Sequence, residues 1–282
     1  MADTLPRIPA GVTAQALRSI ESCEDPRLRE IVRALVQHMH AFVREVQLTP
    51  EEWFFGIDFL TRTGQKCDAL RQEFILLSDV LGVSMAVDEV AHAEVPANAT
   101  ESSALGPFYT ADAPEIAHGE TIARSGKGEP VLLRGRVLDV RGKPIGGALV
   151  ETWETDGEGL YDTQYAERGE PDYRGNLRTK DDGSFSFRAI KPVSYSIPTD
   201  GPVGEVLRGL RRSTMRPAHL HVKIEAPGYR SLATSLYTAG DPYLETDAVF
   251  GAKNSLVEEY HPAGGNAPVR YTLERDFVLA DA

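Results

Sequence analysis

Cysteine is scarce in this sequence: its 282 residues include only two, Cys23 and Cys67. Two cysteines cannot form a framework of disulfides, and they are not spaced like the ligands of a zinc site. A reducing cytoplasm is therefore the expected location.

Long apolar runs and excess positive charge are also absent. No stretch approaches the roughly 20 apolar residues of a membrane-spanning helix, and residues 1–7 lack the apolar run of a signal peptide. The 30 Lys and Arg residues are outnumbered by 42 Asp and Glu, which gives a net charge of −12. Because this charge repels phosphate groups, we expect neither a nucleic-acid partner nor membrane insertion.

The first third of the chain has helical periodicity. Apolar residues over 25–47 recur along one stripe, which predicts an amphipathic helix. His38 and His40 lie on different faces of that helix, so they are not expected to bind one metal ion. An intramolecular contact or a dimer interface would explain the stripe equally well.

Two further helices are expected before residue 85. Thr49 is a capping residue, Pro50 suits the first helical position, and Glu52 completes a capping box, so a helix should begin there. Another helix is expected over 68–81, ended by Gly82.

The remainder of the chain is rich in strand signals. Residues 95–128 contain several prolines and glycines without periodicity and are interpreted as a connecting segment. Short strands separated by turn residues then favour a β-sandwich. The fold class is therefore mainly β with an α-helical N-terminal part, divided into a helical domain with linker (1–105) and a β-sandwich domain (106–282). The expected strands cover 131–138, 148–153, 184–187 and 218–224.

Two histidines and two tyrosines form the candidate metal site. His219 and His221 are two apart on an expected strand, so both rings point to the same face. Tyr161 and Tyr195 precede them in glycine-rich or proline-rich loops. A bound cation can deprotonate a phenol, and phenolate prefers a hard, oxidised ion, so this donor set favours Fe(III).

Two alternatives use the same residues differently. His219, His221 and Glu225 share one strand face, which also suits a ferrous or cupin-like centre of two histidines and one carboxylate. A β-sandwich can also be a binding module without catalytic activity, because fold does not determine function.

Several motifs occur together in this chain: LGPFY at 105–109, GALVETW at 147–153, DGEGLY at 156–161, RT at 178–179 with DGSF at 182–185, YSIPTDGPVG at 195–204, and RPAHLH at 216–221. Together they make the sequence similar to a known family, the intradiol ring-cleaving dioxygenases. The similarity covers the chain from about residue 20 to its end.

The resemblance implies an Fe(III) enzyme that cleaves a catechol ring between its hydroxyls with O2. Tyr161, Tyr195, His219 and His221 would be the protein ligands of one iron ion per chain, and a solvent hydroxide would be the fifth ligand. Tyr195 would leave the metal and accept a proton from the incoming diol. Arg216 would stabilise negative charge that develops on the substrate. In this family the N-terminal helices build a homodimer interface that can enclose phospholipid.

Segments 76–85, 195–200 and 241–251 are most similar to the branch that cleaves hydroxyquinol (1,2,4-trihydroxybenzene) to 3-hydroxy-cis,cis-muconate or maleylacetate. Catechol and chlorocatechol remain alternative substrates. Asp79 could bind the third hydroxyl or be a helix-surface carboxylate. Ser235 replaces a glutamine of catechol-cleaving relatives, and a shorter hydroxyl cannot make the same contact near Arg216. The residues expected around the substrate ring are Leu76, Asp79, Ala104, Leu105, Gly106, Pro107, Phe108, Ile197, Pro198 and Arg216.

Overall fold

The computed structural model describes residues 11–68, 71–167, 169–265 and 267–282. The chain divides into two compact units, Met1–Thr61 and Arg62–Ala282. Of the helices in the described ranges, none combines the length and the apolar character that crossing a membrane requires.

The first unit consists of helices. It contains α1 (Val12–Ser19), α2 (Pro26–Glu45) and the start of α3 (Pro50–Gln65), which ends in the second unit. The predicted capping box is present: the Glu52 N–H donates to Thr49 Oγ1 at 3.3 Å, and the Thr49 N–H donates to Glu52 Oε2 at 2.9 Å. His40 Nδ1 contacts the Thr13 hydroxyl of α1 at 2.9 Å.

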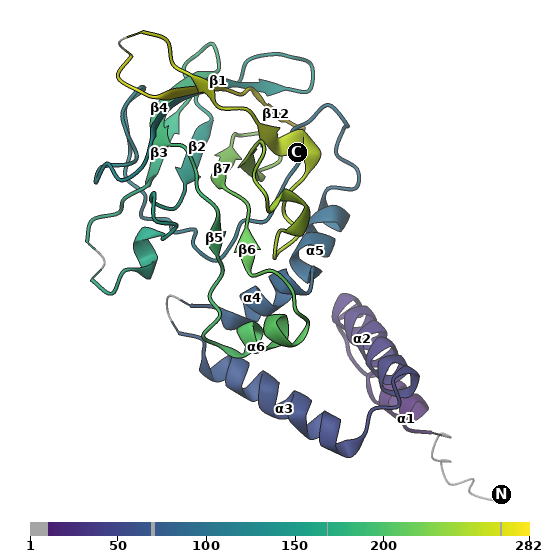
Figure 1. Cartoon of the computed structure of the whole chain (residues 1–282). Helices are drawn as coiled ribbons and strands as arrows, with labels where there is room; N and C mark the ends of the chain where they lie inside the picture. Colours follow the sequence, from purple (N-terminus) through teal and green to yellow (C-terminus); the bar gives the residue numbers. More distant parts are fainter. Residues whose placement is uncertain (1–10, 69–70, 168, 266) are drawn as a thin grey trace, which may run out of the picture. The chain divides into compact units, whose positions relative to one another are not determined.

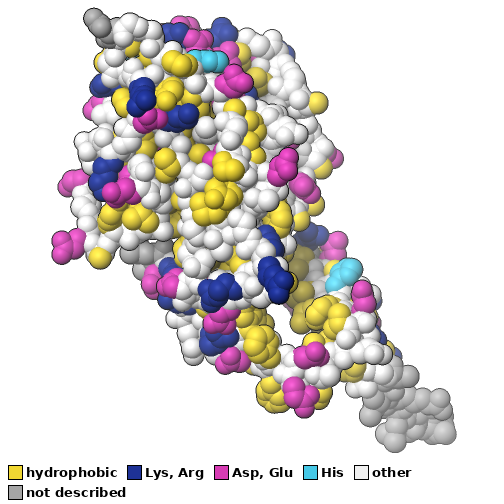
Figure 2. All heavy atoms as spheres, viewed as in Figure 1, with side chains coloured by type: hydrophobic (Ala, Val, Ile, Leu, Met, Phe, Trp, Pro, Cys, Tyr) yellow, Lys and Arg dark blue, Asp and Glu magenta, His cyan; other side chains and the backbone are white. Residues whose placement is uncertain are grey.

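The predicted apolar stripe of α2 is exposed in the single chain. No residue of this helix is buried, and the large apolar side chains of the stripe are between 44% and 57% exposed. Figure 2 shows apolar side chains on the surface of these helices. The exposed stripe residues are Leu28, Ile31, Leu35, Met39, Phe42, Val43 and Val46, whereas Val32 and Val36 of the predicted stripe are half-buried.

Two five-stranded sheets form the centre of the second unit (Figure 1). Val131 and Phe187 of the first sheet and Val150, Val222 and Leu236 of the second belong to one buried apolar core. The fold is therefore a β-sandwich, as predicted. The first sheet has the order β10 (His261–Pro262), β11 (Tyr271–Glu274), β1 (Pro130–Asp139), β12 (Phe277–Leu279), with β4 (Ser184–Ile190) also on β1; the second has the order β3 (Arg174–Arg178), β2 (Leu149–Trp153), β7 (His219–Glu225), β8 (Leu232–Thr238), β9 (Val257–Glu258).

Strand β7 separates the core from the candidate site. Leu220, Val222 and Ile224 belong to the core between the sheets. Because strand side chains alternate, His219 and His221 point to the outer face of the second sheet. The two histidines are therefore positioned by a strand whose other face is packed in the core.

The second unit also contains helices and short segments outside the two sheets. They include α4 (Glu73–Val80), α5 (Val83–Ala91), α6 (Pro202–Gly209), the pair β5 (Tyr195–Ser196) and β6 (Met215–Arg216), and the 3-10 turns η1 (Asp162–Gln164), η2 (Leu244–Thr246) and η3 (Asn254–Leu256). Figure 1 shows α4 and α6 next to the ends of β5 and β6. An apolar cluster joins these elements: Leu76, Val80, Ile197, Val203, Leu207, Ala248 and Val249.

One predicted helix is shorter than expected, and three helices, α1, α5 and α6, were not predicted. The helix expected over 68–81 is present only as α4, which starts at Glu73; residues 69–70 lie outside the described part. Before α4, the Arg71 N–H donates to the Asp68 side chain at 2.8 Å, and the Arg71 guanidinium bonds to Asp200 at 2.7 Å. These bonds stabilise a non-helical backbone. The helices α5 and α6 are too short to give a clear periodic signal.

Candidate metal centre and substrate pocket

The four predicted donor side chains converge on one point of the outer face. His221 Nε2 lies 3.1 Å from both His219 Nε2 and Tyr161 Oη. Tyr161 Oη and Tyr195 Oη are also 3.1 Å apart. Neighbouring ligands on one ion, bound at about 2.1 Å and at right angles, would be separated by roughly 3.0 Å. The spacing of these atoms therefore fits a shared metal ion.

The protonation of the histidines supports the same interpretation. His219 Nδ1 lies 2.6 Å from the Pro217 carbonyl oxygen, which only accepts, so Nδ1 carries the proton. Burial, with the nearby Arg216 charge, lowers the pKa of His219 well below its usual value, and the pKa of His221 is lowered in the same way by burial and by its charged neighbours. Neutral His219 therefore directs the lone pair of Nε2 toward the other donors, where a cation can bind it.

Tyr161 requires a cation to become anionic. Burial raises the pKa of Tyr161 well above its usual value, and the neighbouring Tyr195 adds to this effect. The phenol therefore stays protonated in the protein alone. A bound metal ion can reverse this preference by stabilising the phenolate directly.

The loop before Tyr161 brings the two phenols together. Asp156 accepts the N–H groups of Glu158 and Leu160 at 2.9 and 3.2 Å, which closes a tight turn. Gly159 in this turn has φ +82°, and a Cβ there would lie 3.0 Å from Tyr195 Cβ. Glycine is therefore favoured at this position for both its backbone conformation and its size.

Aromatic rings hold the donors from both sides. The Trp153 ring on β2 stacks on His221 with centroids 4.8 Å apart and an interplanar angle of 6°. Phe108 stacks on Tyr161 at 4.3 Å and 17°. Such packing limits ring rotation, so the donor atoms are preorganised.

Arg216 lies next to the donors in a buried ion pair. Its Nε is 3.1 Å from Asp247 Oδ1, and both side chains are almost completely buried. Nη1 contacts His219 Nε2 at 3.0 Å and Tyr195 Oη at 3.5 Å. Burial lowers the pKa of Arg216, but the Asp247 charge and hydrogen bond, together with Tyr195 and Tyr237, raise it by more, and the net pKa is well above its usual value. A permanent cation therefore lies beside the metal donors.

The two-histidine, one-carboxylate alternative does not fit. Glu225 lies at the exposed end of β7, and its carboxylate pairs with Lys223 at 2.7 Å. Within the described ranges, no group of three or more His, Cys, Asp or Glu side chains is arranged to hold a metal ion. The tyrosines are needed to complete the donor set.

A pocket of about 320 Å³ is lined by Phe108, the residue that stacks on Tyr161, although none of the four donors is among its lining residues. Four of the predicted substrate residues line it: Leu76, Pro107, Phe108 and Pro198. Its rim is polar, with Arg71, Gln72, Glu73, Gln164 and Asp200 among the lining residues.

The other predicted substrate residues do not line this pocket. Ile197 is buried in the apolar cluster with Leu76, and Gly106 lies near the His221 ring. Ala104 is half-buried, whereas Leu105 is exposed. These four residues nevertheless lie within a few positions of residues that line the pocket or belong to the donor group.

Asp79 is not a surface carboxylate: it is 5% exposed and lies one turn after Leu76 on α4. Burial raises its pKa, partly offset by a hydrogen bond with Ser84 and by the charge of Arg216. The helix-surface alternative for this residue is therefore wrong.

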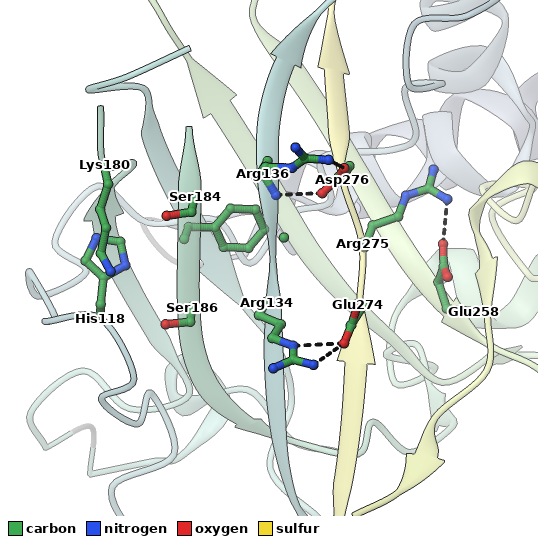
Figure 3. A pocket seen from close by; sticks show the side chains of 12 residues that line it. His118, Arg134, Arg136, Lys180, Ser184, Ser186, Glu258, Glu274, Arg275 and Asp276 are labelled. Carbon is green, nitrogen blue, oxygen red and sulfur yellow. Dashed lines mark hydrogen bonds and ion pairs between the residues drawn. The ribbon is translucent and has the colours of Figure 1, made fainter. Parts of the chain in front are cut away.

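A wider pocket of about 770 Å³ lies elsewhere, along β1, β4 and β11 (Figure 3). None of the predicted site residues lines it. Its guanidinium groups are paired with neighbouring carboxylates, as Arg136 is with Asp276 at 2.9 Å and Arg275 with Glu258 at 2.7 Å. The pocket therefore offers little uncompensated charge to a ligand.

Sequence reasoning missed several residues that support the site. Asp247 is the buried counter-ion of Arg216, and the Tyr237 hydroxyl oxygen accepts a hydrogen bond from the Arg216 guanidinium. Arg174 pairs with Asp162 and bonds to the Phe108 carbonyl at 3.2 Å, which joins two loops of the site. Proximity to Tyr161 was the one available signal for Asp162. Nothing in the local sequence distinguishes the others.

Comparisons with known proteins agree with this architecture. A family model described as "Dioxygenase" matches residues 104–281, and one described as "Catechol dioxygenase N terminus" matches residues 25–99. The chain is 47% identical to a 6-chlorohydroxyquinol 1,2-dioxygenase of Cupriavidus pinatubonensis, over 95% of this chain and 96% of the relative. It is 44% identical to a hydroxyquinol 1,2-dioxygenase of a Rhizobium species, over 93% and 92%.

A solved structure shows the same likeness. The crystal structure of a hydroxyquinol 1,2-dioxygenase from Pseudomonas putida superposes with a TM-score of 0.88 at 47% identity. The superposition covers 96% of this chain and 98% of that one.

Proposed function

The chain belongs to the intradiol ring-cleavage dioxygenases, and from this premise we propose that it cleaves hydroxyquinol between adjacent hydroxyls with O2. The product would be 3-hydroxy-cis,cis-muconate or maleylacetate, with both oxygen atoms retained. The observation that carries the proposal is the convergence of Tyr161, Tyr195, His219 and His221.

We infer that these four side chains hold one Fe(III) ion. Two phenol oxygens suit a hard, oxidised ion better than zinc or ferrous iron. When bound, ferric iron supplies the Lewis-acid and redox character that makes an aromatic diol reactive toward dioxygen.

Arg216 and Tyr195 have distinct roles in this proposal. Tyr195 Oη, at the edge of the donor group, would accept a proton from the incoming diol. Arg216 Nη1, 3.5 Å from that oxygen, would stabilise negative charge on Tyr195 and on the substrate ring. Because Asp247 fixes the guanidinium, little reorganisation is needed when charge develops.

The pocket supports a small aromatic triol as substrate. Leu76, Pro107, Phe108 and Pro198 provide apolar surface for a ring. The Asp79 carboxyl, buried on the same helix, would bind the third hydroxyl, which catechol lacks. Catechol and chlorocatechol remain the alternative substrates.

Oxygen uptake with hydroxyquinol, catechol, chlorocatechols and protocatechuate tests the substrate assignment. Hydroxyquinol should give the highest kcat/KM. Asp79→Ala should lower this value about tenfold or more through loss of a hydrogen bond to a charged group, while catechol turnover changes little. Equal losses for both substrates would contradict the role of Asp79, and faster turnover of catechol by the parent would contradict the hydroxyquinol assignment.

We also propose that two copies associate through the N-terminal helices. Burying the exposed stripe of α2 would remove a large apolar surface from water. A pocket of about 470 Å³ in the helical unit is lined, among others, by Val12, Val43, Leu48, Trp53 and Arg44. The apolar side chains suit the acyl chain of a phospholipid, and the Arg44 guanidinium suits its phosphate. Sedimentation analysis and lipid extraction test these proposals.

Two further proposals concern the domain boundary and the cellular location. We place the functional boundary between the helical domain (1–105) and the catalytic domain (106–282), supported by family matches that meet near it. We propose a cytoplasmic location, which Cys23 and Cys67 support as free thiols.

A further inference from the structure

We propose that Ser235 is a positioning residue: its hydroxyl accepts the Nδ1 proton of His221 and so presents the lone pair of His221 Nε2 to the metal ion. This inference rests on the ferric site proposed above. It assigns a function to Ser235, the position at which the resemblance to catechol-cleaving enzymes led us to expect a glutamine.

The strand register brings the two side chains together. On β7 and β8, His221 is directly opposite Ser235, and His219 is directly opposite Tyr237. Ser235 Oγ lies 3.1 Å from His221 Nδ1, and Ser235 is completely buried. Water therefore cannot replace this contact without a rearrangement of the strand pair.

Ser103, Tyr237 and Ser235 form a row of buried hydroxyls that ends at the Gly251 carbonyl oxygen. Because a carbonyl oxygen can only accept, it determines which hydroxyl donates at each step. The Ser103 hydroxyl donates to the Gly251 carbonyl oxygen at 2.8 Å. Ser103 Oγ must then accept the Tyr237 hydroxyl, 3.0 Å away. Ser235 lies two positions before Tyr237 on the same face of β8, and its hydroxyl lowers the pKa of Tyr237. Because the Tyr237 proton is donated to Ser103, the donor between Ser235 and Tyr237 is the Ser235 hydroxyl. With its own proton used, Ser235 Oγ can only accept the Nδ1–H of His221.

The tautomer of His221 is therefore determined by a chain of buried groups that ends at a carbonyl. Nδ1 holds the proton and Nε2 is free to bind a cation, as His219 is fixed by the Pro217 carbonyl. A ligand histidine whose second nitrogen is fixed in this way has a defined ring orientation and a stronger donor atom.

The same chain connects the metal ligand to the substrate arginine. Arg216 Nη2 donates to Tyr237 Oη at 3.2 Å. A Cβ at Gly251 would lie 2.8 Å from Tyr237 Oη and 3.1 Å from both Arg216 Nη2 and Ser103 Oγ. Glycine at this position thus permits the hydroxyls and the guanidinium to pack closely. Ser235 is therefore linked to Arg216 by way of the Tyr237 hydroxyl. Although serine is shorter than glutamine, the polar network around Arg216 remains continuous.

The test compares Ser235→Ala, which loses the acceptor, with Ser235→Thr, which keeps a hydroxyl. Ser186→Ala on β4 is the matched control, because it removes a strand serine of the other sheet. Iron release to a chelator is the main readout. Ser235→Ala should release iron about 10- to 100-fold faster than the parent, and its visible absorption band should shift. Ser235→Thr should return both properties toward the parent, and Ser186→Ala should leave them unchanged.

A second variant tests the chain beyond Ser235. Tyr237→Phe keeps the ring but removes the next hydroxyl, so iron release should rise by a smaller factor than in Ser235→Ala. Release from Ser235→Ala within about twofold of the parent, or release from Ser235→Thr as fast as from Ser235→Ala, would overturn the inference. A parent protein that binds no iron would instead refute the proposed function.

Discussion

Replacing Asp247 with asparagine should destabilise the folded protein by about 3–5 kcal/mol, because it leaves the buried Arg216 charge without a counter-ion. The Asp247 carboxylate is only 2% exposed and pairs with the guanidinium through both oxygens. It also accepts backbone N–H groups from Val249, Gly251 and Ala252 at 3.2, 2.9 and 3.2 Å. An asparagine amide carries no charge and would direct its own N–H groups at some of these donors.

Urea denaturation of the metal-free protein measures this loss. The control is Glu274→Gln, which breaks the Arg134–Glu274 pair, in which both side chains are more than half exposed. That change should cost less than about 1 kcal/mol, because solvent screens the charges. A double variant, Arg216→Met with Asp247→Asn, removes the unpaired cation and should regain part of the lost stability.

The result that would refute this reasoning is a small effect. If Asp247→Asn costs less than about 1 kcal/mol, like the exposed pair, the guanidinium finds compensation without the carboxylate. If the double variant is as unstable as the two single losses added together, the two groups do not interact as the structure indicates.

Three further predictions concern the donors, the arginine and a buried carboxyl. Tyr161→Phe should lose most of the visible absorption and retained iron, whereas Tyr173→Phe, another buried tyrosine, should keep both; unchanged colour and iron content in Tyr161→Phe would show that Tyr161 is not a ligand. Arg216→Ala should retain iron but lower kcat by roughly 10²-fold through loss of a preorganised cation, and full turnover would contradict that role. Burial raises the pKa of Glu154 well above its usual 4.5, against a weaker opposing hydrogen bond from the Ile190 N–H. The folded protein then holds a proton that the unfolded chain releases, so stability should fall by up to about 1.4 kcal/mol per pH unit as pH rises above the unfolded pKa. Urea midpoints between pH 5 and 8 should show this decline in the parent and not in Glu154→Gln; parallel curves would mean that the carboxyl is charged in the folded state.

The sequence predicted the main elements of the fold where local signals were strong. The capping residues around Thr49 identified the start of α3, and the apolar periodicity of residues 25–47 identified α2. The strand containing His219 and His221 was also expected. Helices α5 and α6 have only nine and eight residues, and their stability comes from packing rather than from their own periodicity.

Residue chemistry alone predicted only the donors of the candidate site, whereas Arg216 and the four pocket residues were expected from the family resemblance. Tyr161, Tyr195 and the histidine pair lie in motifs whose chemistry can be argued from residue type. Asp247 and Tyr237 were missed because their importance comes from contacts with Arg216, 31 and 21 positions away in the sequence. The hydrogen-bond direction that fixes His221 depends on Ser103 and a carbonyl, so no local pattern could show it.

Along β7 and β8, alternate side chains face the apolar core and the candidate site, so each position serves either the fold or the site. Even-numbered positions such as Val222 and Leu236 maintain the core, whereas odd-numbered ones such as His221 and Ser235 face the chemistry. Substitutions at odd positions can therefore change the polar face of the sheet while the apolar core between the sheets stays the same. A single inserted residue would exchange the two sets and abolish both properties at once.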